Sequence, residues 1–316
     1  MNVFDIEDIN EIQADDINRV VALGFFDGLH RGHKEIISRA VAYAKKQGLK
    51  SCLITFDISP KEFFSKEKVK LLTPRKQKLS ILKDLGIDEV YVIKFNDKLS
   101  KFSREEFIDN VLLKLNIKSA FCGEDYLFGH MGKGTPTFIE EYTKNIIEVN
   151  VVNLIKAEDD FKVSSSTLRN LIYDGKVSEY KEKSGNYYKI SGHVIKGKQL
   201  GRTISFPTAN LELEEEYVVP KQLGVYITKL KIGENYYKGI TNIGKNPTVS
   251  DTEHVNIETH ILNFDKDIYG ERIELTFYEY IRSEKKFSGL TELKEQLKND
   301  KEIAEMYDIN LSIEIN

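Results

Sequence analysis

The chain has 316 residues, of which 41% are hydrophobic and 30% charged, so it holds enough apolar material for two domains and is not wholly disordered. Its 46 basic and 50 acidic side chains give a formal net charge of −4, which provides no long-range attraction for a polyanion such as duplex DNA. The amino terminus lacks the basic residues of a secretory signal, and the longest apolar stretch, residues 20–26, is too short to cross a bilayer. We therefore expect a cytoplasmic protein that binds neither nucleic acid nor membranes.

The two cysteines, Cys52 and Cys122, stand far apart in the sequence. Neither belongs to a CxxC or a similar spacing, so the sequence indicates neither a zinc site nor a disulfide framework. We expect two ordinary buried thiols.

In the first half of the chain, short β-branched runs alternate with amphipathic helical stretches. The predicted strands cover residues 19–25, 51–56, 89–95, 119–123 and 150–155. Three helices are predicted between them. The first covers residues 33–47 and ends at Gly48, and the second runs from Thr73-Pro74 to Gly86. The third begins with a capping box of Ser103 and Glu106. Strands separated by helices of this length predict a parallel sheet with right-handed crossovers.

After about residue 183 apolar and polar residues alternate, as is typical of half-buried strands. The predicted strands cover residues 188–194, 224–231, 236–243, 255–263 and 272–281. Five or six strands without intervening helices predict a small antiparallel barrel, and residues 288–298 predict a helix that flanks it. A polar stretch separates the halves, so we predict domains over residues 1–183 and 184–316.

The segment GFFDGLHRGH, residues 24–33, follows a predicted strand and leads into a predicted helix. Ligands of open α/β sheets bind at this edge. His30 and His33 would place two imidazoles and free backbone N–H groups around one anion, and Gly28 would let the backbone approach it closely. The segment predicts a phosphate site, for which triphosphate is the first candidate; the alternative is a turn with two polar rings.

The segment VSSSTLR, residues 163–169, offers hydroxyl groups and a guanidinium at a predicted helix start. Ser164, Ser165 and Arg169 can hold phosphate oxygens through hydrogen bonds. Taken alone, the segment predicts only a helix cap. Together with the two histidines it predicts the other half of a phosphate site.

These two segments, with GEDYLFG at residues 123–129, resemble the FMN adenylyltransferase module of bacterial bifunctional riboflavin kinase/FAD synthetases. The resemblance implies an α/β nucleotidylyltransferase-like fold with a Rossmann-like parallel sheet. It implies that His30, His33 and Arg169 offset charge on the phosphates of ATP. It also implies that nucleotide or flavin is bound at Gly24, Phe26, Asp27, Gly28, Gly123, Asp125, Ser164 and Ser165.

One departure from that family matters. Where the family commonly has TFxPHP after the second strand, this chain reads TFDISP, so Ser59 stands where an imidazole is expected. The departure predicts that adenylyl transfer could be slowed or lost.

In the second half, a loop with Gly197 and Gly201 precedes the sequence PTAN at residues 207–210. The glycines could bring backbone N–H groups onto phosphates, while Thr208 and Asn210 offer oxygens suited to Mg²⁺. On these residues alone, a barrel hairpin followed by a turn is the simpler interpretation. Glu258 alone would likewise be taken as a solvent-facing strand residue.

The match along the rest of the chain reverses that interpretation. GRTISFPTAN at residues 201–210, IETH at residues 257–260 and DIYG at residues 267–270 resemble the riboflavin kinase module of the same family, a six-stranded barrel. The resemblance implies that Thr208 and Asn210 hold Mg²⁺ and ATP. It further implies that Glu258 accepts the proton of the ribityl 5′-hydroxyl.

Three further positions follow from this resemblance. Arg282 and Phe287 lie in a segment that looks like the family's flavin-closing loop, and a strand end with a helix-packing ring is the alternative. Ser205 replaces the glycine usual before FPTAN, and we expect the backbone there to need no positive φ.

We therefore predict an enzyme with Mg²⁺ and ATP that converts riboflavin to FMN and FMN to FAD with release of pyrophosphate, acting as a monomer or weak homo-oligomer on small-molecule substrates. Phosphoryl transfer of this kind needs alignment and neutralised phosphates more than a protein nucleophile. One alternative is a riboflavin kinase with weakened or lost adenylyltransferase activity. Others are a non-catalytic flavin-responsive binding protein and a different nucleotidylyltransferase.

Overall fold

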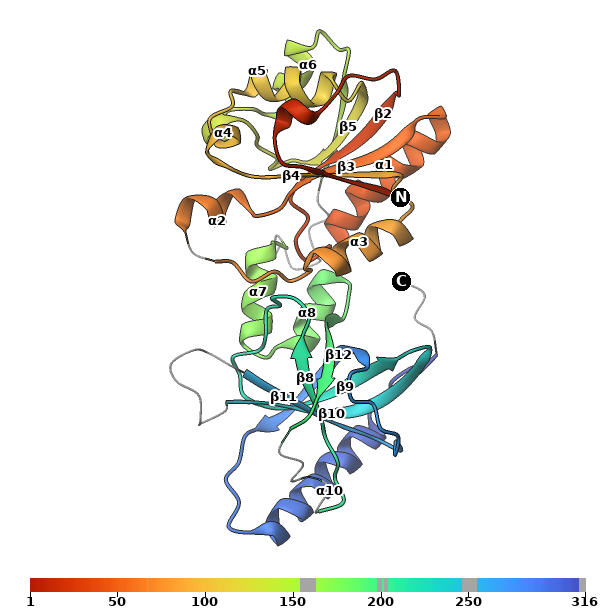
Figure 1. The fold of residues 1–316 in the computed structure, drawn as a ribbon, viewed down its shortest axis with the longest axis vertical. Coiled ribbons are helices and arrows are strands. Elements are labelled where there is room, and N and C mark those ends of the chain that lie inside the picture. Colours follow the sequence, from red (N-terminus) through yellow and green to blue (C-terminus); the bar gives the residue numbers. More distant parts are fainter. Residues whose placement is uncertain (67, 154–162, 198–200, 202–203, 246–254, 313–316) are drawn as a thin grey trace. The chain divides into compact units, whose positions relative to one another are not determined.

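The computed structural model describes residues 1–66, 68–153, 163–197, 201, 204–245 and 255–312. Contacts within the chain divide it into two compact units (Figure 1). The first unit contains residues 1–69 and 75–163, and the second contains residues 70–74 and 164–316.

A parallel sheet of six strands forms the first unit, in the order β1-β4-β3-β2-β5-β6. Its strands are β1 (Asn2–Ile6), β2 (Arg19–Leu23), β3 (Lys50–Phe56), β4 (Glu89–Ile93), β5 (Ile117–Gly123) and β6 (Glu148–Val152). The predicted Rossmann-like sheet is confirmed. Residues 154–155 of the last predicted strand lie outside the described residues, and β1 was not predicted.

Helices cover both faces of this sheet. They are α1 (Arg31–Gln47), α2 (Pro60–Ser65), α3 (Arg75–Asp84), α4 (Asp97–Ser100), α5 (Arg104–Phe107) and α6 (Pro136–Tyr142). Two short 3₁₀ helices, η1 (Ile9–Glu11) and η3 (His130–Gly132), and a π-helix that continues α5, η2 (Ile108–Leu113), complete the set among the described residues. Side chains alternate along β2, so Val20 and Ala22 pack with α1 and α3 while Val21 packs with η2. The predicted stop at Gly48 and the capping box at Ser103 are confirmed.

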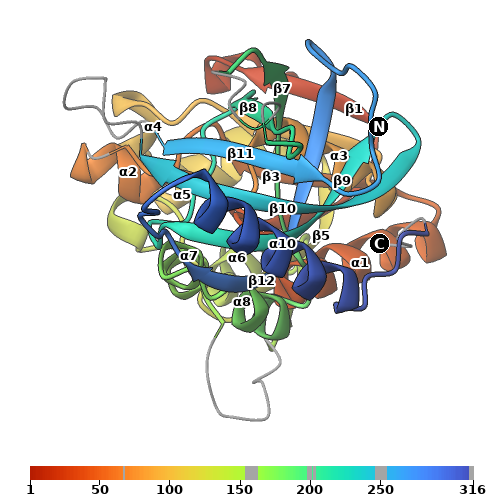
Figure 2. The same ribbon diagram turned by 90° about the horizontal axis from the view of Figure 1, so that it is seen from below.

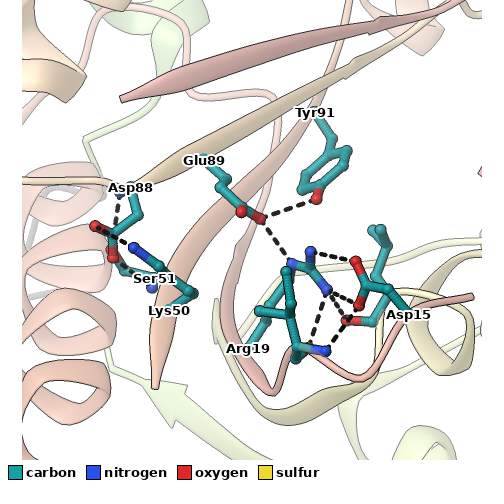
Figure 3. Close-up of polar contacts among 9 residues, drawn as sticks. Asp15, Arg19, Lys50, Ser51, Asp88, Glu89 and Tyr91 are labelled. Carbon is teal, nitrogen blue, oxygen red and sulfur yellow. Dashed lines mark hydrogen bonds and ion pairs between the residues drawn. The ribbon is translucent and has the colours of Figure 1, made fainter. Parts of the chain in front are cut away.

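A buried ionic network joins the amino-terminal ends of the strands (Figure 3). Arg19, which begins β2, donates to Glu89 of β4 and to Asp15, in both cases at 2.7 Å. The Tyr91 hydroxyl donates to the same Glu89 carboxylate at 2.9 Å. Because the amino-terminal ends of parallel strands share one edge, this network fixes the edge opposite the loop of residues 24–30.

A closed antiparallel barrel forms the core of the second unit, in the order β10-β11-β8-β7-β12-β9. Its strands are β7 (Tyr188–Ile195), β8 (Ala209–Leu213), β9 (Gly224–Ile232), β10 (Asn235–Lys245), β11 (Val255–Ile261) and β12 (Arg272–Ser283). The six-stranded barrel is confirmed. The end of PTAN begins β8 and is not merely a turn.

Among the described residues, three helices accompany the barrel: α7 (Ser165–Tyr173), α8 (Val177–Ser184) and α10 (Leu290–Met306). Figure 2 shows α10 lying across β10, which it contacts. The predicted helix at residues 288–298 is confirmed and continues to Met306. Within the part of the chain that the structure describes, none of the helices has the length and apolar character needed to span a membrane.

Candidate active sites

The first candidate site lies where the strand order reverses. β2 is followed in the sheet by β3 and β4 on one side, whereas β5, on its other side, is followed by β6. The loops after β2 and β5 therefore leave neighbouring strands in opposite directions. Crevices of this kind are where open α/β sheets bind ligands, and both the His30 loop and Gly123, the last residue of β5, reach this edge.

The loop of residues 24–30 holds an unusual backbone. Phe26, Gly28 and Leu29 have φ values of 54°, 83° and 36°, although only glycine adopts such values without cost. The ring of Phe26 folds back over Gly24, where an added Cβ would lie 2.9 Å from it. Non-glycine residues in this region persist only where their surroundings fix them, and such residues cluster at functional sites.

The two predicted histidines lie together. His30 precedes α1, His33 lies in its first turn, and the ring centroids are 3.7 Å apart in a stacked arrangement. The rings of Phe26 and His33 pack edge to face, with their centroids 5.3 Å apart. The Phe26 side chain is buried in the core. The Nδ1 atoms of both imidazoles are buried and have no hydrogen-bond partner among the described residues.

Both imidazoles are neutral near pH 7. Burial lowers the pKa of His30 to about 4, and the Asp125 carboxylate opposes this shift. The pKa of His33 is lowered well below its usual value by burial, and further by His30 and Lys78. A pair of neutral, unpaired imidazoles fits an anionic group, which would supply acceptors and favour protonation.

The predicted Asp27, Asp125 and Gly123 frame the same edge. Asp27 is buried, whereas Asp125 is exposed on the loop after β5 and acts electrostatically on His30. A residue that the sequence analysis missed, Lys78 of α3, is also buried here and donates to the Phe25 carbonyl at 2.9 Å. The sequence could have indicated its burial, because Lys78 lies four residues before Leu82, on the buried face of α3.

An aromatic cavity of about 350 Å³ opens at the carboxyl ends of β3, β4 and β5. Phe56, Phe95 and Tyr126 line it, and each follows or ends a different strand. Pro60 and Phe64 of α2 complete one wall. A planar aromatic ligand fits such a lining, because offset and edge-on ring contacts are favourable.

Ser59, where an imidazole was expected, caps α2. Its hydroxyl accepts a hydrogen bond from the Glu62 backbone N–H at 3.0 Å. The residue therefore has a local structural role in the helix that bears Phe64.

The predicted Ser164, Ser165 and Arg169 belong to the second compact unit by their contacts. Ser164 caps α7 by accepting from the Thr167 N–H at 3.2 Å, and Arg169 donates to the Lys70 carbonyl at 3.1 Å. Their part in holding a triphosphate stays a prediction.

The second candidate site lies on neighbouring barrel strands. Glu258 of β11 is the cross-strand partner of Asn210 on β8 and of Asn242 on β10. Asn256 donates to Glu258 at 2.6 Å, and the Thr208 hydroxyl lies 3.5 Å from the other carboxylate oxygen. The register of the barrel thus brings together the three residues predicted for this site.

These residues fit a magnesium ion. Thr208 and Asn210 offer oxygens, and Mg²⁺ in nucleotide sites is held by few protein oxygens together with phosphates. The backbone comes close here, since a Cβ added to Gly197 would lie 2.3 Å from the Asn210 side-chain nitrogen. A Cβ on Gly201 would lie 2.1 Å from the Phe206 carbonyl oxygen, so this position requires glycine, whereas at Gly197 the Asn210 side chain could move aside. Residues 198–200 and 202–203 of this loop lie outside the described residues.

The expectation for Ser205 is wrong. Its backbone has a φ of 63°, in the left-handed region that favours glycine. The turn after Gly201 needs this conformation because the Phe206 N–H returns to the Gly201 carbonyl at 2.9 Å. The serine therefore carries local strain that a glycine would not.

Two cavities meet at Thr208, which lines both. One, of about 510 Å³, is bordered by the segment from Phe264 to Tyr269. The other, of about 370 Å³, contains Glu258 and is largely apolar, with Phe206, Phe287 and leucines of α10 in its wall. The arrangement can hold two different ligands on either side of one hydroxyl.

Arg282 lines the apolar cavity, but its guanidinium binds a protein carboxylate. It donates to both oxygens of the buried Asp300 on α10, at 2.9 and 2.6 Å. This pair joins β12 to α10, and sequence reasoning missed Asp300. Contact of Arg282 with flavin or nucleotide stays a prediction.

The chain is similar to known proteins along almost its whole length. Residues 12–167 match the FAD synthetase family and residues 184–307 match the riboflavin kinase family. Relatives named bifunctional riboflavin kinase/FMN adenylyltransferase are 39% identical in Listeria monocytogenes, over 91% of this chain and 91% of theirs, and 36% identical in Bacillus subtilis, over 95% and 96%. In Escherichia coli the identity is 32%, over 92% of this chain and 93% of the relative.

A solved structure described as a macrolide-efflux protein from Streptococcus pneumoniae has the same fold. Its TM-score is 0.89 at 31% identity, and the match covers 98% of this chain and 100% of that one. We take from it the fold alone.

The predicted activities and co-substrates are confirmed by the two family matches and by relatives that are similar over almost their whole length. The substrates are the small molecules ATP, riboflavin and FMN, and Mg²⁺ is general for these enzymes. The chain belongs to the bifunctional riboflavin kinase/FMN adenylyltransferase family, whose reactions form FMN from riboflavin and FAD from FMN.

Proposed function

We propose that the two reactions are divided between the two sites: adenylyl transfer within residues 1–183 and riboflavin phosphorylation within residues 184–316. The observation that carries this division is that each compact unit has its own cavity beside its own polar cluster. The family matches, at residues 12–167 and 184–307, support the same division.

In the kinase site, riboflavin occupies the apolar cavity and ATP the larger one. The ring system of riboflavin is matched by Phe206, Phe287 and the α10 leucines, while the larger cavity has the more polar border of residues 264–269. Thr208, shared by both cavities, then lies where the γ-phosphate meets the ribityl chain. Glu258 lines the flavin side, in position to receive a proton from the 5′-hydroxyl.

The kinase reaction transfers the γ-phosphoryl group of ATP directly to riboflavin. The 5′-oxygen of riboflavin bonds to the γ-phosphorus, the bond to the ADP oxygen breaks, and the hydroxyl proton moves to Glu258. Asn256 orients the carboxylate through its 2.6 Å hydrogen bond. Mg²⁺, held by the ATP phosphates with Thr208 and Asn210, would neutralise the phosphate charge.

The Glu258→Gln variant tests this site. We expect FMN formation from riboflavin to fall by about a hundredfold or more, while FAD formation from added FMN stays unchanged. Glu212→Gln, which changes an exposed glutamate on β8, is the matched control and should leave both reactions intact. Undiminished FMN formation by Glu258→Gln would overturn the assignment.

In the adenylyltransferase site, the flavin of FMN occupies the aromatic cavity and the ATP phosphates contact the histidine pair. An FMN phosphate oxygen bonds to the α-phosphorus of ATP, and the bond to pyrophosphate breaks, so no enzyme intermediate is needed. His30 and His33 donate to phosphate oxygens, and the backbone of Gly28 and the start of α1 add N–H donors. We propose that Asp27, Gly123 and Asp125 border the nucleotide.

The His30→Asn variant tests this site. It keeps a polar side chain but removes the ring, and we expect FAD formation to fall by about a hundredfold, with FMN formation unchanged. His193→Asn, at an exposed position on β7, is the matched control. FAD formation at the unaltered rate by His30→Asn would sink the proposal.

Ser59 motivates a second candidate, in which the kinase is strong and adenylyl transfer is weak. The hydroxyl of Ser59 caps α2 and offers no imidazole to the phosphates. Purified protein with FMN, ATP and Mg²⁺ separates the two cases: FAD and pyrophosphate in equal amounts support the bifunctional enzyme, whereas neither product would leave the kinase alone.

We also propose that the enzyme is cytoplasmic and acts as a monomer or weak homo-oligomer. Its two cysteines are buried free thiols, as is common in reducing compartments. Sedimentation at several protein concentrations would measure the assembly state, and a concentration-independent oligomer would contradict this expectation.

A further inference from the structure

We propose that Lys78 is a positioning residue for adenylyl transfer: from α3, its ammonium group binds the Phe25 carbonyl and holds the loop of residues 24–30 in the shape that presents His30 and His33. The inference rests on the proposed adenylyltransferase site in the first unit. It assigns a role to a residue outside the motifs of that site.

Lys78 is buried, where the desolvation of a lysine side chain is energetically unfavourable. Its side chain is 6% exposed, whereas lysines are almost never buried unless they are paired. Its Nζ lies 2.9 Å from the Phe25 carbonyl oxygen and 4.6 Å from the centroid of the Phe25 ring. A methionine or leucine would fill the same face of α3 without the free-energy cost of burying a charge. The interactions of the ammonium group must therefore offset that cost.

The same carbonyl receives a second hydrogen bond from another element. The Thr55 hydroxyl, near the end of β3, donates to Phe25 O at 3.0 Å. β3 and α3 therefore both fix the peptide between Phe25 and Phe26, just beyond the end of β2. A carbonyl that accepts two side-chain hydrogen bonds is held in place, unlike a carbonyl in a turn that faces solvent; we call it the anchor of the loop.

The loop beyond this anchor needs such a constraint. Phe26 and Leu29 have positive φ values of 54° and 36°, each of which costs on the order of 1 kcal/mol or more for a residue with a side chain. Without the anchor, relaxation of these residues would move the His30 backbone and the start of α1. Misplacement by about 1 Å can cost on the order of a hundredfold in rate when reacting groups must be aligned.

The charges around Lys78 support a role at this site. Asp27 acts on it electrostatically and is itself buried, and the cation in turn acts on His33. Burial lowers the pKa of Lys78 to about 8, against the opposing effect of Asp27, so the group remains largely charged near pH 7. The ammonium thus adds positive potential beside two neutral imidazoles.

Lys78→Met tests the inference, with Lys83→Met as the matched control. Both lysines lie on α3, but Lys83 is exposed. We expect Lys78→Met to lower kcat for FAD formation by about tenfold or more, with KM for FMN changed less than about twofold, because Lys78 does not line the aromatic cavity. Lys78→Arg, which keeps a cationic donor, should recover part of the loss.

The bifunctional chain provides an internal control. FMN formation by the same protein should stay unchanged in Lys78→Met, which separates a local effect from loss of folded protein. An equal loss of both reactions, or unchanged FAD formation, would overturn the inference. If His30→Asn also left FAD formation intact, the proposed site itself would fail; a loss in His30→Asn alone would reject only the role of Lys78.

A double-mutant cycle with Thr55→Val tests the route through the Phe25 carbonyl. Two donors that act through one carbonyl should show a coupling in log kcat that departs clearly from additivity. Additive effects would contradict the positioning role, because they would mean that Lys78 acts on the substrate or the fold by a separate route.

Discussion

At the scale of single residues, the histidine pair of the proposed phosphate site carries no formal charge near pH 7. The two rings are stacked at 3.7 Å, and both Nδ1 atoms are left without partners among the described residues. Two imidazolium ions at this distance would repel each other, so the pair stays neutral until an anion arrives. The Nδ1 atoms of His30 and His33 would therefore be able to bind a ligand in the proposed site.

The neutral state of His30 predicts acid-sensitive stability. The pKa of His30 is about 4 in the folded protein and returns to its usual 6.5 on unfolding. Between these values the unfolded chain binds more protons, so the free energy of unfolding falls as the pH falls. We expect His30→Gln to remove about 2 kcal/mol of the loss in stability between about pH 7 and about pH 5.

Urea unfolding at the two pH values measures this effect. His193→Gln, at an exposed histidine, is the control and should lose stability with pH as the unaltered protein does. Parallel losses in the His30→Gln variant and the unaltered protein would show that His30 does not titrate as inferred.

The backbone of Ser205 leads to a second prediction. With a φ of 63°, this residue should prefer glycine, and Ser205→Gly is expected to stabilise the barrel by up to about 1 kcal/mol. Ser205→Val should destabilise it, because a β-branched side chain tolerates this conformation poorly. Thermal unfolding of the three proteins measures the order, and a less stable Ser205→Gly variant would contradict the assigned strain.

The sequence predicted the residues that carry recognisable spacing and missed those that depend on packing. His30 and His33, and likewise Thr208 and Asn210, lie close together in the sequence, so short segments disclosed them. Asp300 gains its role from the packing of α10 on β12, which no short segment encodes. Asn256 lies two residues from Glu258 on the same strand, but as a lone amide it carries no recognisable motif. Ser205 was misjudged because the hydrogen bond that closes its turn could not be read from composition.

At the scale of elements, the capping of α2 links Ser59 to the aromatic cavity. The helix is only six residues long and places Pro60 and Phe64 in the cavity wall, so its first hydrogen bond matters. Loss of such a cap costs about 1 kcal/mol. We expect Ser59→Ala to raise KM for FMN severalfold in FAD formation, with a smaller change in kcat.

Ser59→Asp is the matched control, because aspartate is also a preferred helix cap. It should keep KM for FMN near that of the unaltered protein. Steady-state FAD formation at varied FMN gives both constants, and equal KM values for the alanine and aspartate variants would show that the cap does not position Phe64.

Elements with a clear apolar period were predictable, and those fixed by partners were not. The helix α1 and the strands β2 to β5 carry long apolar patterns that match their burial. β1 has four exposed residues out of five and owes its strand form to pairing with β4. β8 follows a proline and a close turn, so local signals favoured a turn although β7 and β11 pair with it.

At the scale of the whole molecule, the product of one reaction is the substrate of the other. In the proposed division of the two reactions, FMN would leave the barrel as a product and enter the aromatic cavity of the first unit as a substrate. The two cavities share an aromatic character but differ in their polar partners, a carboxylate beside threonine in one and two imidazoles at the sheet edge in the other. In this proposal one flavin binds between similar aromatic walls in both cavities, and different polar groups act on it in each.

The extent of the kinase unit provides the last prediction. The helix α8 packs on β12 and β7, with Val177 and Tyr180 buried and the Ser178 hydroxyl donating to Glu279 at 3.0 Å. A fragment of residues 184–316 lacks these contacts, whereas a fragment of residues 164–316 keeps them. Burying two such side chains stabilises by about 3 kcal/mol or more, so the longer fragment should unfold at a clearly higher temperature.

Both fragments should phosphorylate riboflavin at low temperature, because Thr208, Asn210 and Glu258 lie within each. On warming, the shorter fragment should lose activity first, at the temperature where its unfolding begins. Tyr180→Ala in the longer fragment is the control and should lower its unfolding temperature toward that of the shorter one, since the ring packs edge-on against Tyr188 at 5.4 Å. Equal unfolding temperatures for the two fragments would show that α8 adds nothing to the barrel.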